Sequence, residues 1–193
     1  MQVNIEKEQA NRIQFSISGV TTAFSNAVRR YSMTHNAVLA MDTVVFYDNT
    51  ASLFDEYLAH RIGLIPVVTP DKTPESAEII FSLDETGPKV VYSKDLKSSD
   101  KDISVARENI PIITLTEGQH LKFEAKAIVG YGTKHAKFQS GLASYAIKDD
   151  TFKFIVESFY QMEPTEIVLR ACNVLEKDIS ELLKALKAAA KKK

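Results

Sequence analysis

The chain has 193 residues, of which 45% are hydrophobic, 25% charged and 9% aromatic. This composition is typical of folded globular proteins and excludes wholesale disorder and fibrous repeats. The 24 Lys and Arg residues are balanced by 25 Asp and Glu residues, so no basic excess indicates a nucleic-acid or membrane ligand. The single cysteine excludes an intramolecular disulfide and any metal site built from several thiolates. Because no segment predicts a signal peptide or a membrane span, we expect a cytoplasmic protein.

The amino-terminal segment predicts a hairpin followed by a helix. Apolar residues alternate with polar ones at positions 3–5 and 13–17, as in a half-buried β-hairpin. Gly19 ends the hairpin, and Thr21 or Thr22 can cap a helix that ends near Asn36. The apolar side of this helix is formed by Phe24, Val28, Tyr31 and His35. Its basic flank is formed by Arg29 and Arg30.

A β-rich segment and a short second helix follow. Residues 38–47 favour a strand, and Asp48 and Asn49 favour a turn. We expect the short helix to begin at Ser52 and to end at Gly63. Residues 67–77 contain two prolines and predict a loop.

The rest of the chain predicts antiparallel strands and one long helix. Apolar residues alternate in 79–83, 121–129 and 152–156. Pro164 is suited to the first turn of a helix whose apolar positions step by four and three residues, the spacing of a helix–helix seam. These positions are Val168, Cys172, Leu175, Ile179, Leu182 and Leu186. The pattern alone does not distinguish burial within the subunit from burial against a partner.

Together these elements predict an α+β fold in which both chain ends build one domain around an inserted one. We expect residues 1–42 and 148–193 to form the composite domain, and residues 43–147 to form a β-rich insert. The lysine-rich tail, 191–193, is expected to be solvated.

Residue types that commonly carry chemistry are present but poorly arranged for it. The four histidines do not have metal-ligand spacing, and 130–134 lacks the spacing of a phosphate-binding loop, so its glycines predict a tight turn. Cys172 lies on the helix seam and is expected to be buried as a small hydrophobe. One enzymatic hypothesis remains: Glu56 and His60 are four residues apart on one helix face and could work together in a small stand-alone enzyme.

Several ordered motifs resemble the D subunit of archaeal DNA-directed RNA polymerase, over nearly the whole chain. The two most specific are FSNAVRR, residues 24–30, and FDEYLAHRIGLIP, residues 54–66. Four further segments follow in the same order: 91–96, 109–112, 135–139 and 156–158. That family is similar to the eukaryotic third-largest polymerase subunit and to the amino-terminal region of the bacterial alpha subunit.

The resemblance implies a non-catalytic subunit with a dimerisation domain built from both chain ends. Its implied partner is the small subunit L, and this pair, with small subunits N and P, would form the platform for the large catalytic subunits. Magnesium would be bound only by those large subunits, and no sequence-specific DNA contact is expected. Relatives with a cysteine-rich insertion carry an iron–sulfur cluster, whereas the residues after 139 lack these cysteines, so we expect no iron–sulfur cluster and no zinc.

The resemblance also implies roles for individual residues. It assigns docking of a large subunit to the first helix and to the second motif, through Asn26, Arg29, Arg30, His60 and Arg61. It assigns the L interface to the apolar positions of the first and last helices: Phe24, Val28, Tyr31, Val168, Cys172, Leu175, Ile179, Leu182 and Leu186.

Overall fold

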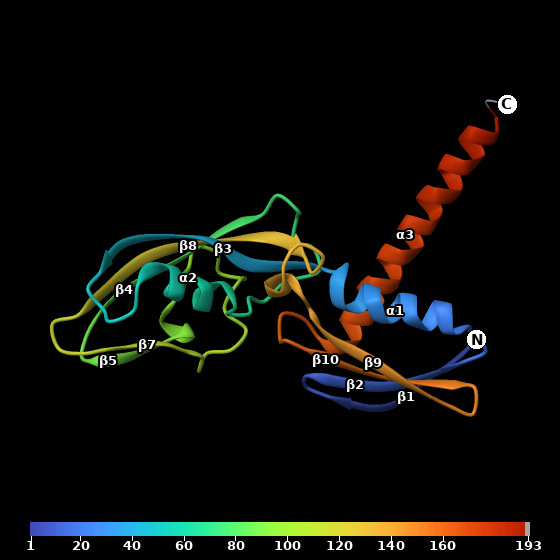
Figure 1. Cartoon of the computed structure of the whole chain (residues 1–193), viewed down its shortest axis with the longest axis horizontal. Coiled ribbons are helices and arrows are strands. Elements are labelled where there is room, and N and C mark those ends of the chain that lie inside the picture. Colours follow the sequence, from blue (N-terminus) through green and yellow to red (C-terminus); the bar gives the residue numbers. More distant parts are fainter. Residues whose placement is uncertain (192–193) are drawn as a thin grey trace. The chain divides into compact units, whose positions relative to one another are not determined.

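The computed structural model describes residues 1–191, which contain three α-helices and ten β-strands (Figure 1). Lys192 and Lys193, part of the tail expected to be solvated, lie outside the described residues. The chain forms two compact units. Unit 1 comprises residues 1–36, 139–159 and 163–193, and unit 2 comprises residues 37–138 and 160–162. No helix within residues 1–191 is long and apolar enough to cross a membrane.

Unit 1 contains a four-stranded antiparallel sheet. Its strands are β1 (Gln2–Gln9), β2 (Arg12–Ser18), β9 (Gly141–Lys148) and β10 (Thr151–Ser158), in the order β1-β2-β10-β9. The predicted hairpin is therefore present, and one face of β2 and β10 is buried: the rings of Phe15 and Phe154 stack with centroids 5.0 Å apart. β9 is not predicted: the first inward residues, Gly141 and Ala143, are too small to give a clear hydrophobic alternation, although Tyr145 on the same face contacts the rings of Phe152 and Phe154.

Two helices cover the buried face of this sheet. α1 (Thr22–Thr34) is capped by Thr21, whose hydroxyl accepts a hydrogen bond of 3.3 Å from the Phe24 amide. α3 (Pro164–Ala190) has its proline in the first turn and buries Ile167 and Ala171. Within unit 1, the carboxy-terminal half of α3 continues beyond the sheet (Figure 1). Only the first part of this long helix is therefore packed by its own unit.

A buried polar cluster joins the two helices to the start of β9. The Asn36 amide nitrogen lies 3.1 Å from the Ser140 hydroxyl, 3.1 Å from the Ile167 carbonyl and 3.2 Å from the Ser32 carbonyl. The Ser140 hydroxyl in turn donates to the Ser32 carbonyl at 2.9 Å. These groups are shielded from water, so water cannot replace the hydrogen bonds of Asn36 if its side chain is removed.

Unit 2 is β-rich, as predicted, and completes the α+β fold. Its main antiparallel sheet has the order β3-β8-β4-β6, with a smaller pair β5-β7 beside it. The bounds are β3 (Ala37–Asn49), β4 (Glu78–Thr86), β5 (Lys89–Tyr92), β6 (Lys97–Ser98), β7 (Pro111–Leu115) and β8 (His120–Tyr131). α2 (Asp55–Gly63) packs on β3 and adds Leu58 and Ile62 to a core that includes Phe81 and Phe123. Short 3-10 turns occupy Ser93–Asp95 and Ala136–Phe138.

The predicted domain boundaries after residues 42 and 147 fall inside β3 and β9. The compact units instead divide after residues 36 and 138, where the chain passes from one sheet to the other. Alternation identifies a strand but does not show which sheet the strand joins, which explains the difference.

One local prediction is wrong, and another is correct only in part. α2 begins at Asp55 rather than at Ser52, because the Asn49 side chain holds the preceding residues in a turn: it accepts from the Ala51 amide at 3.1 Å and donates to the Leu53 carbonyl at 2.9 Å. The tight turn predicted in 130–134 is present at residues 132–134, where the Lys134 amide donates to the Tyr131 carbonyl at 2.9 Å, but Gly130 lies before it, inside β8. Glycine is required there because a Cβ atom would stand 2.6 Å from the buried ring of Phe138.

Candidate interaction surface

The most conspicuous surface of unit 1 is the apolar stripe along the distal half of α3. Ile179, Leu182 and Leu186 are 57%, 60% and 59% exposed, and Leu183, next to them, is also exposed. Val168 and Leu175, nearer the sheet, are half-buried. A contiguous row of exposed leucines on one helix is typical of a surface that a partner covers.

A groove of about 250 Å³ separates this stripe from α1. It is lined by Phe24, Cys172, Leu175, Glu176, Ile179 and Ser180. Cys172 is exposed at this groove, so the prediction of a core thiol is wrong, because no element of unit 1 covers this side of α3. The surrounding apolar atoms still raise the pKa of the Cys172 thiol by desolvation.

A second groove, of about 150 Å³, lies between α3 and the β1-β2 hairpin. Its lining is apolar apart from the Thr165 hydroxyl: Val3, Ile5, Ile13, Phe15, Thr165, Val168 and Leu169. The sequence motifs do not assign Val3, Ile5 or Leu169 to any interface. The strand register could have identified Val3 and Ile5. Val3 pairs with Ile17 and Ile5 pairs with Phe15, so Val3 and Ile5 extend the face of the sheet that β2 buries.

Two of the α1 residues expected at the interface have other positions. Val28 is only 3% exposed, so it packs inside unit 1 and cannot contact a partner directly. The Tyr31 hydroxyl donates a 2.8 Å hydrogen bond to the Asp178 carboxylate of α3, and its ring stacks on His35 at 4.0 Å. The bond to Asp178, and then desolvation, raise the pKa of Tyr31. Tyr31 therefore ties α1 to the exposed half of α3.

The polar residues expected to dock a large subunit are engaged to different extents. On α1, the Arg29 guanidinium donates to the Asn26 side-chain oxygen at 3.1 and 3.0 Å. Arg30 is exposed, and its guanidinium forms no hydrogen bond or ion pair with the residues that the structure describes. Of this pair, Arg30 is the one free to bind a carboxylate of another chain.

On α2 too, one of the two residues, Arg61, is bonded within the chain, and the other, His60, is not. Arg61 donates to the carbonyls of Pro111, at 2.6 Å, and Ile112, at 3.1 Å, and so fixes α2 to β7. His60 is exposed and has no hydrogen bond to any residue in the described range. Glu56 lines a polar hollow formed by residues 49 and 51–56, which His60 does not reach. Since no hydrogen bond joins Glu56 to His60, the geometry gives no support to the enzymatic hypothesis.

Within residues 1–191, no group of three or more His, Cys, Asp or Glu side chains is arranged to hold a metal ion.

Comparison with known proteins identifies the family. Residues 44–146 match the family model of the RNA polymerase Rpb3/RpoA insert domain. DNA-directed RNA polymerase subunit Rpo3 of Methanocaldococcus jannaschii is 42% identical over 165 residues, which cover 85% of this chain and 85% of that protein. The chain belongs to the Rpo3 family. This assignment confirms the resemblance to the archaeal polymerase D subunit.

Other Rpo3 relatives are longer than this chain. The Rpo3 of Thermococcus kodakarensis is 41% identical over 152 residues, 75% of this chain but 59% of that protein. The Rpo3 of Halobacterium salinarum is 42% identical over 130 residues, 67% of this chain and 52% of that protein. Members of the Rpo3 family therefore differ in length.

Proposed function

We propose that this chain is an assembly subunit of an archaeal DNA-directed RNA polymerase, with no catalytic residues of its own. It pairs with small subunit L, joins small subunits N and P, and provides the platform on which the large catalytic subunits assemble. Membership of the Rpo3 family supports the polymerase assignment. Cytoplasmic location is part of the same proposal.

The exposed stripe of α3 is the single observation that carries the pairing with L. Leaving Ile179, Leu182 and Leu186 in water has a free-energy cost that a partner removes by covering them. The two grooves that flank α3 extend this surface to Phe24 on one side and to Val3 and Ile5 on the other. A surface that combines a helix face with two apolar grooves suits a permanent heterodimer, whose interfaces often exceed about 2,000 Å² in total.

Docking of the large subunits is assigned to the polar residues beside this surface. Arg30 is the main candidate because its guanidinium is exposed and uncommitted, whereas Asn26 and Arg29 satisfy each other. His60 is a second accessible side chain, on α2. Arg61 supports the docking surface indirectly, by holding α2 on β7.

The proposal includes no metal bound by this chain, with magnesium held only by the large subunits. One cysteine cannot supply the thiolates of an iron–sulfur cluster or of a structural zinc site. Metal analysis of the purified chain tests this point, and stoichiometric iron or zinc would overturn it.

Co-expression with subunit L, followed by size-exclusion chromatography with light scattering, tests the pairing. We expect a stable one-to-one heterodimer with the wild-type chain, and its loss in Leu182→Asp. Leu142→Asp is the matched control, because Leu142 is equally an exposed leucine of unit 1 but lies on β9, on the face of the sheet away from the helices. A wild-type chain that stays monomeric beside L, or a Leu182→Asp chain that still pairs, would overturn the proposal.

A further inference from the structure

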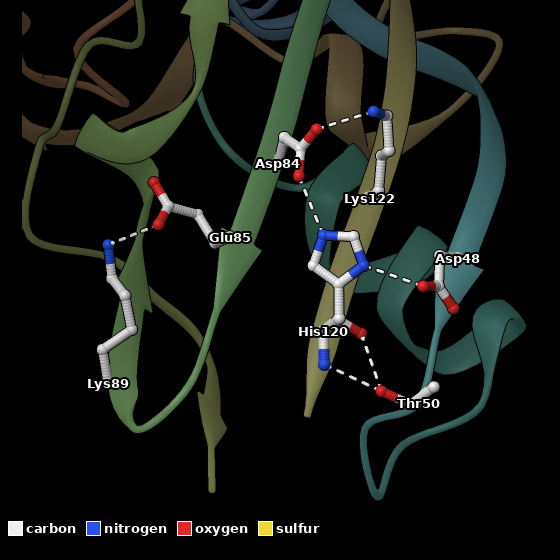
Figure 2. Close-up of polar contacts among 7 residues, drawn as sticks. All are labelled: Asp48, Thr50, Asp84, Glu85, Lys89, His120 and Lys122. Atoms are coloured by element: carbon white, nitrogen blue, oxygen red, sulfur yellow. Dashed lines mark hydrogen bonds and ion pairs between the residues drawn. The ribbon is translucent and has the colours of Figure 1, made fainter. Parts of the chain in front are cut away.

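In unit 2, the imidazole of His120 lies between two carboxylates that belong to two different strands (Figure 2). His120 is the first residue of β8, the strand between β3 and β4 in the main sheet. Its Nδ1 is 2.8 Å from an oxygen of Asp48 on β3, and its Nε2 is 2.8 Å from an oxygen of Asp84 on β4. One side chain therefore connects three adjacent strands.

The strand pairing explains how these residues meet. On β8, His120, Lys122 and Glu124 alternate with buried residues and so share the open face of the sheet. Asp84 pairs with Lys122 and reaches His120 diagonally. A bulge in β3 between Phe46 and Asp48 shifts the register there, which brings Asp48 to the same face.

The geometry favours a charged imidazole. A neutral imidazole has one N–H, so its other nitrogen would turn a lone pair toward a carboxylate, whereas the imidazolium donates to both carboxylates. Lys122 is a further charged group at this point: it pairs with the other oxygen of Asp84 at 2.6 Å, and Glu124, next on the same face of β8, helps to raise the pKa of Lys122. The hydrogen bonds that His120 donates to Asp48 and then to Asp84 raise the pKa of His120, against desolvation. The bonds from Lys122 and His120 lower the pKa of Asp84.

His120 also holds the loop that leads into α2. Its backbone amide donates to the Thr50 hydroxyl at 2.7 Å, and its carbonyl accepts from the Thr50 amide at 3.0 Å. The neighbouring Asn49 side chain donates to the Leu53 carbonyl at 2.9 Å and to the Asp55 carboxylate at 2.7 Å. The imidazole reaches this segment through Asp48, and the backbone contacts of His120 with Thr50 and the side chain of Asn49 continue from there to the first residue of α2.

We propose that His120 is a protonation-controlled anchor: its imidazolium fixes Asp48 and the following loop, residues 49–54, and its deprotonation releases them. The consequence is a pH-dependent order at the amino terminus of α2. This inference concerns the folding of unit 2 and does not depend on the proposed role in polymerase assembly.

The direction of the pH dependence follows from the two pKa shifts. Because the pKa of His120 is higher in the folded state, its contribution is complete below the unfolded value and is lost as the pH rises through the folded value. Because the pKa of Asp84 is lower in the folded state, its contribution is lost as the pH falls through that lowered value. The anchor is therefore closed between these two limits and opens on the alkaline side when His120 loses its proton.

The test follows the full chain by NMR across pH, through the ring resonances of His120 and the hydrogen exchange of amides 50–54, corrected for intrinsic exchange. We expect His120 to titrate above about 6.5, the value of an unstructured peptide, and to titrate lower in Asp48→Asn. Amides 50–54 should exchange about two- to fivefold faster above the His120 midpoint than below it, a range typical of exposed ion pairs.

Two comparisons make the result specific. His120→Gln should abolish the pH dependence of amides 50–54, while the amides of the loop 67–77 serve as the internal reference in every sample. A His120 midpoint at or below the peptide value would overturn the inference. Equal protection of amides 50–54 on both sides of the midpoint, or a pH dependence that persists in His120→Gln, would also overturn it.

Discussion

Leu182 allows the proposed interface to be tested quantitatively. The side chain is 60% exposed in the isolated chain, so most of its surface is available to a partner. Leu182→Ala removes three carbon groups, and burying each one is worth about 0.8 kcal/mol. Scaled by the exposed fraction of the side chain, the loss of burial at the interface is about 1.4 kcal/mol. We therefore expect the substitution to raise the dissociation constant of the complex with subunit L by about tenfold.

Two measurements on the same variant separate an interface residue from a core residue. Isothermal titration calorimetry gives the affinity for subunit L, and thermal unfolding of the chain without L gives its own stability. An interface residue lowers the affinity and leaves the melting temperature unchanged, whereas a core residue lowers the melting temperature. Leu142→Ala, on the outer face of β9, should change neither. An unchanged affinity in Leu182→Ala would refute the reasoning.

Three further predictions concern the buried cluster, a close packing contact and the docking surface. Asn36→Ala should destabilise unit 1 by about 1–3 kcal/mol in denaturant titrations, because it removes buried hydrogen bonds that water cannot replace, while Asn109→Ala, at an exposed loop position, should have little effect. Gly130→Ala should cost about 1–3 kcal/mol because its Cβ would overlap a buried aromatic ring; Gly63→Ala, which meets only ordinary contacts, should cost less, and equal costs would contradict the packing argument. Arg30→Glu should weaken docking of the large subunits in reconstitution assays while pairing with L survives, and unchanged docking would remove Arg30 from the surface.

The elements predicted correctly are those in which local sequence and tertiary burial agree. The alternation of residues 13–17 matches a strand that is buried on one face, and Thr21 caps α1 as its position indicates. Pro164 is in the first turn of α3. In each case one short-range signal, a periodicity or a cap, is sufficient to define the element.

The features that were missed depend on contacts between distant residues. Gly130 is explained by an aromatic ring eight positions later, and the start of α2 by the side chain of Asn49. The exposure of Cys172 could not be predicted, because the apolar spacing of a helix face does not depend on whether the same chain or another chain buries it. The second groove of unit 1 could be predicted only from the pairing of β1 with β2, in the register that places Val3 on the buried side.

The assembly of unit 1 from separate chain segments affects the order of events during synthesis on the ribosome. β2 emerges early, but β10, its neighbour in the sheet, emerges about 130 residues later, a delay of roughly 7–30 s at typical elongation rates. Residues 37–138 of unit 2 are continuous, so most of this unit can fold within that interval. During this interval Ile13, Phe15 and Ile17, which are buried in the folded unit, remain exposed to solvent on the nascent chain. Slower translation therefore prolongs the period in which nascent chains are vulnerable to aggregation and dependent on chaperones.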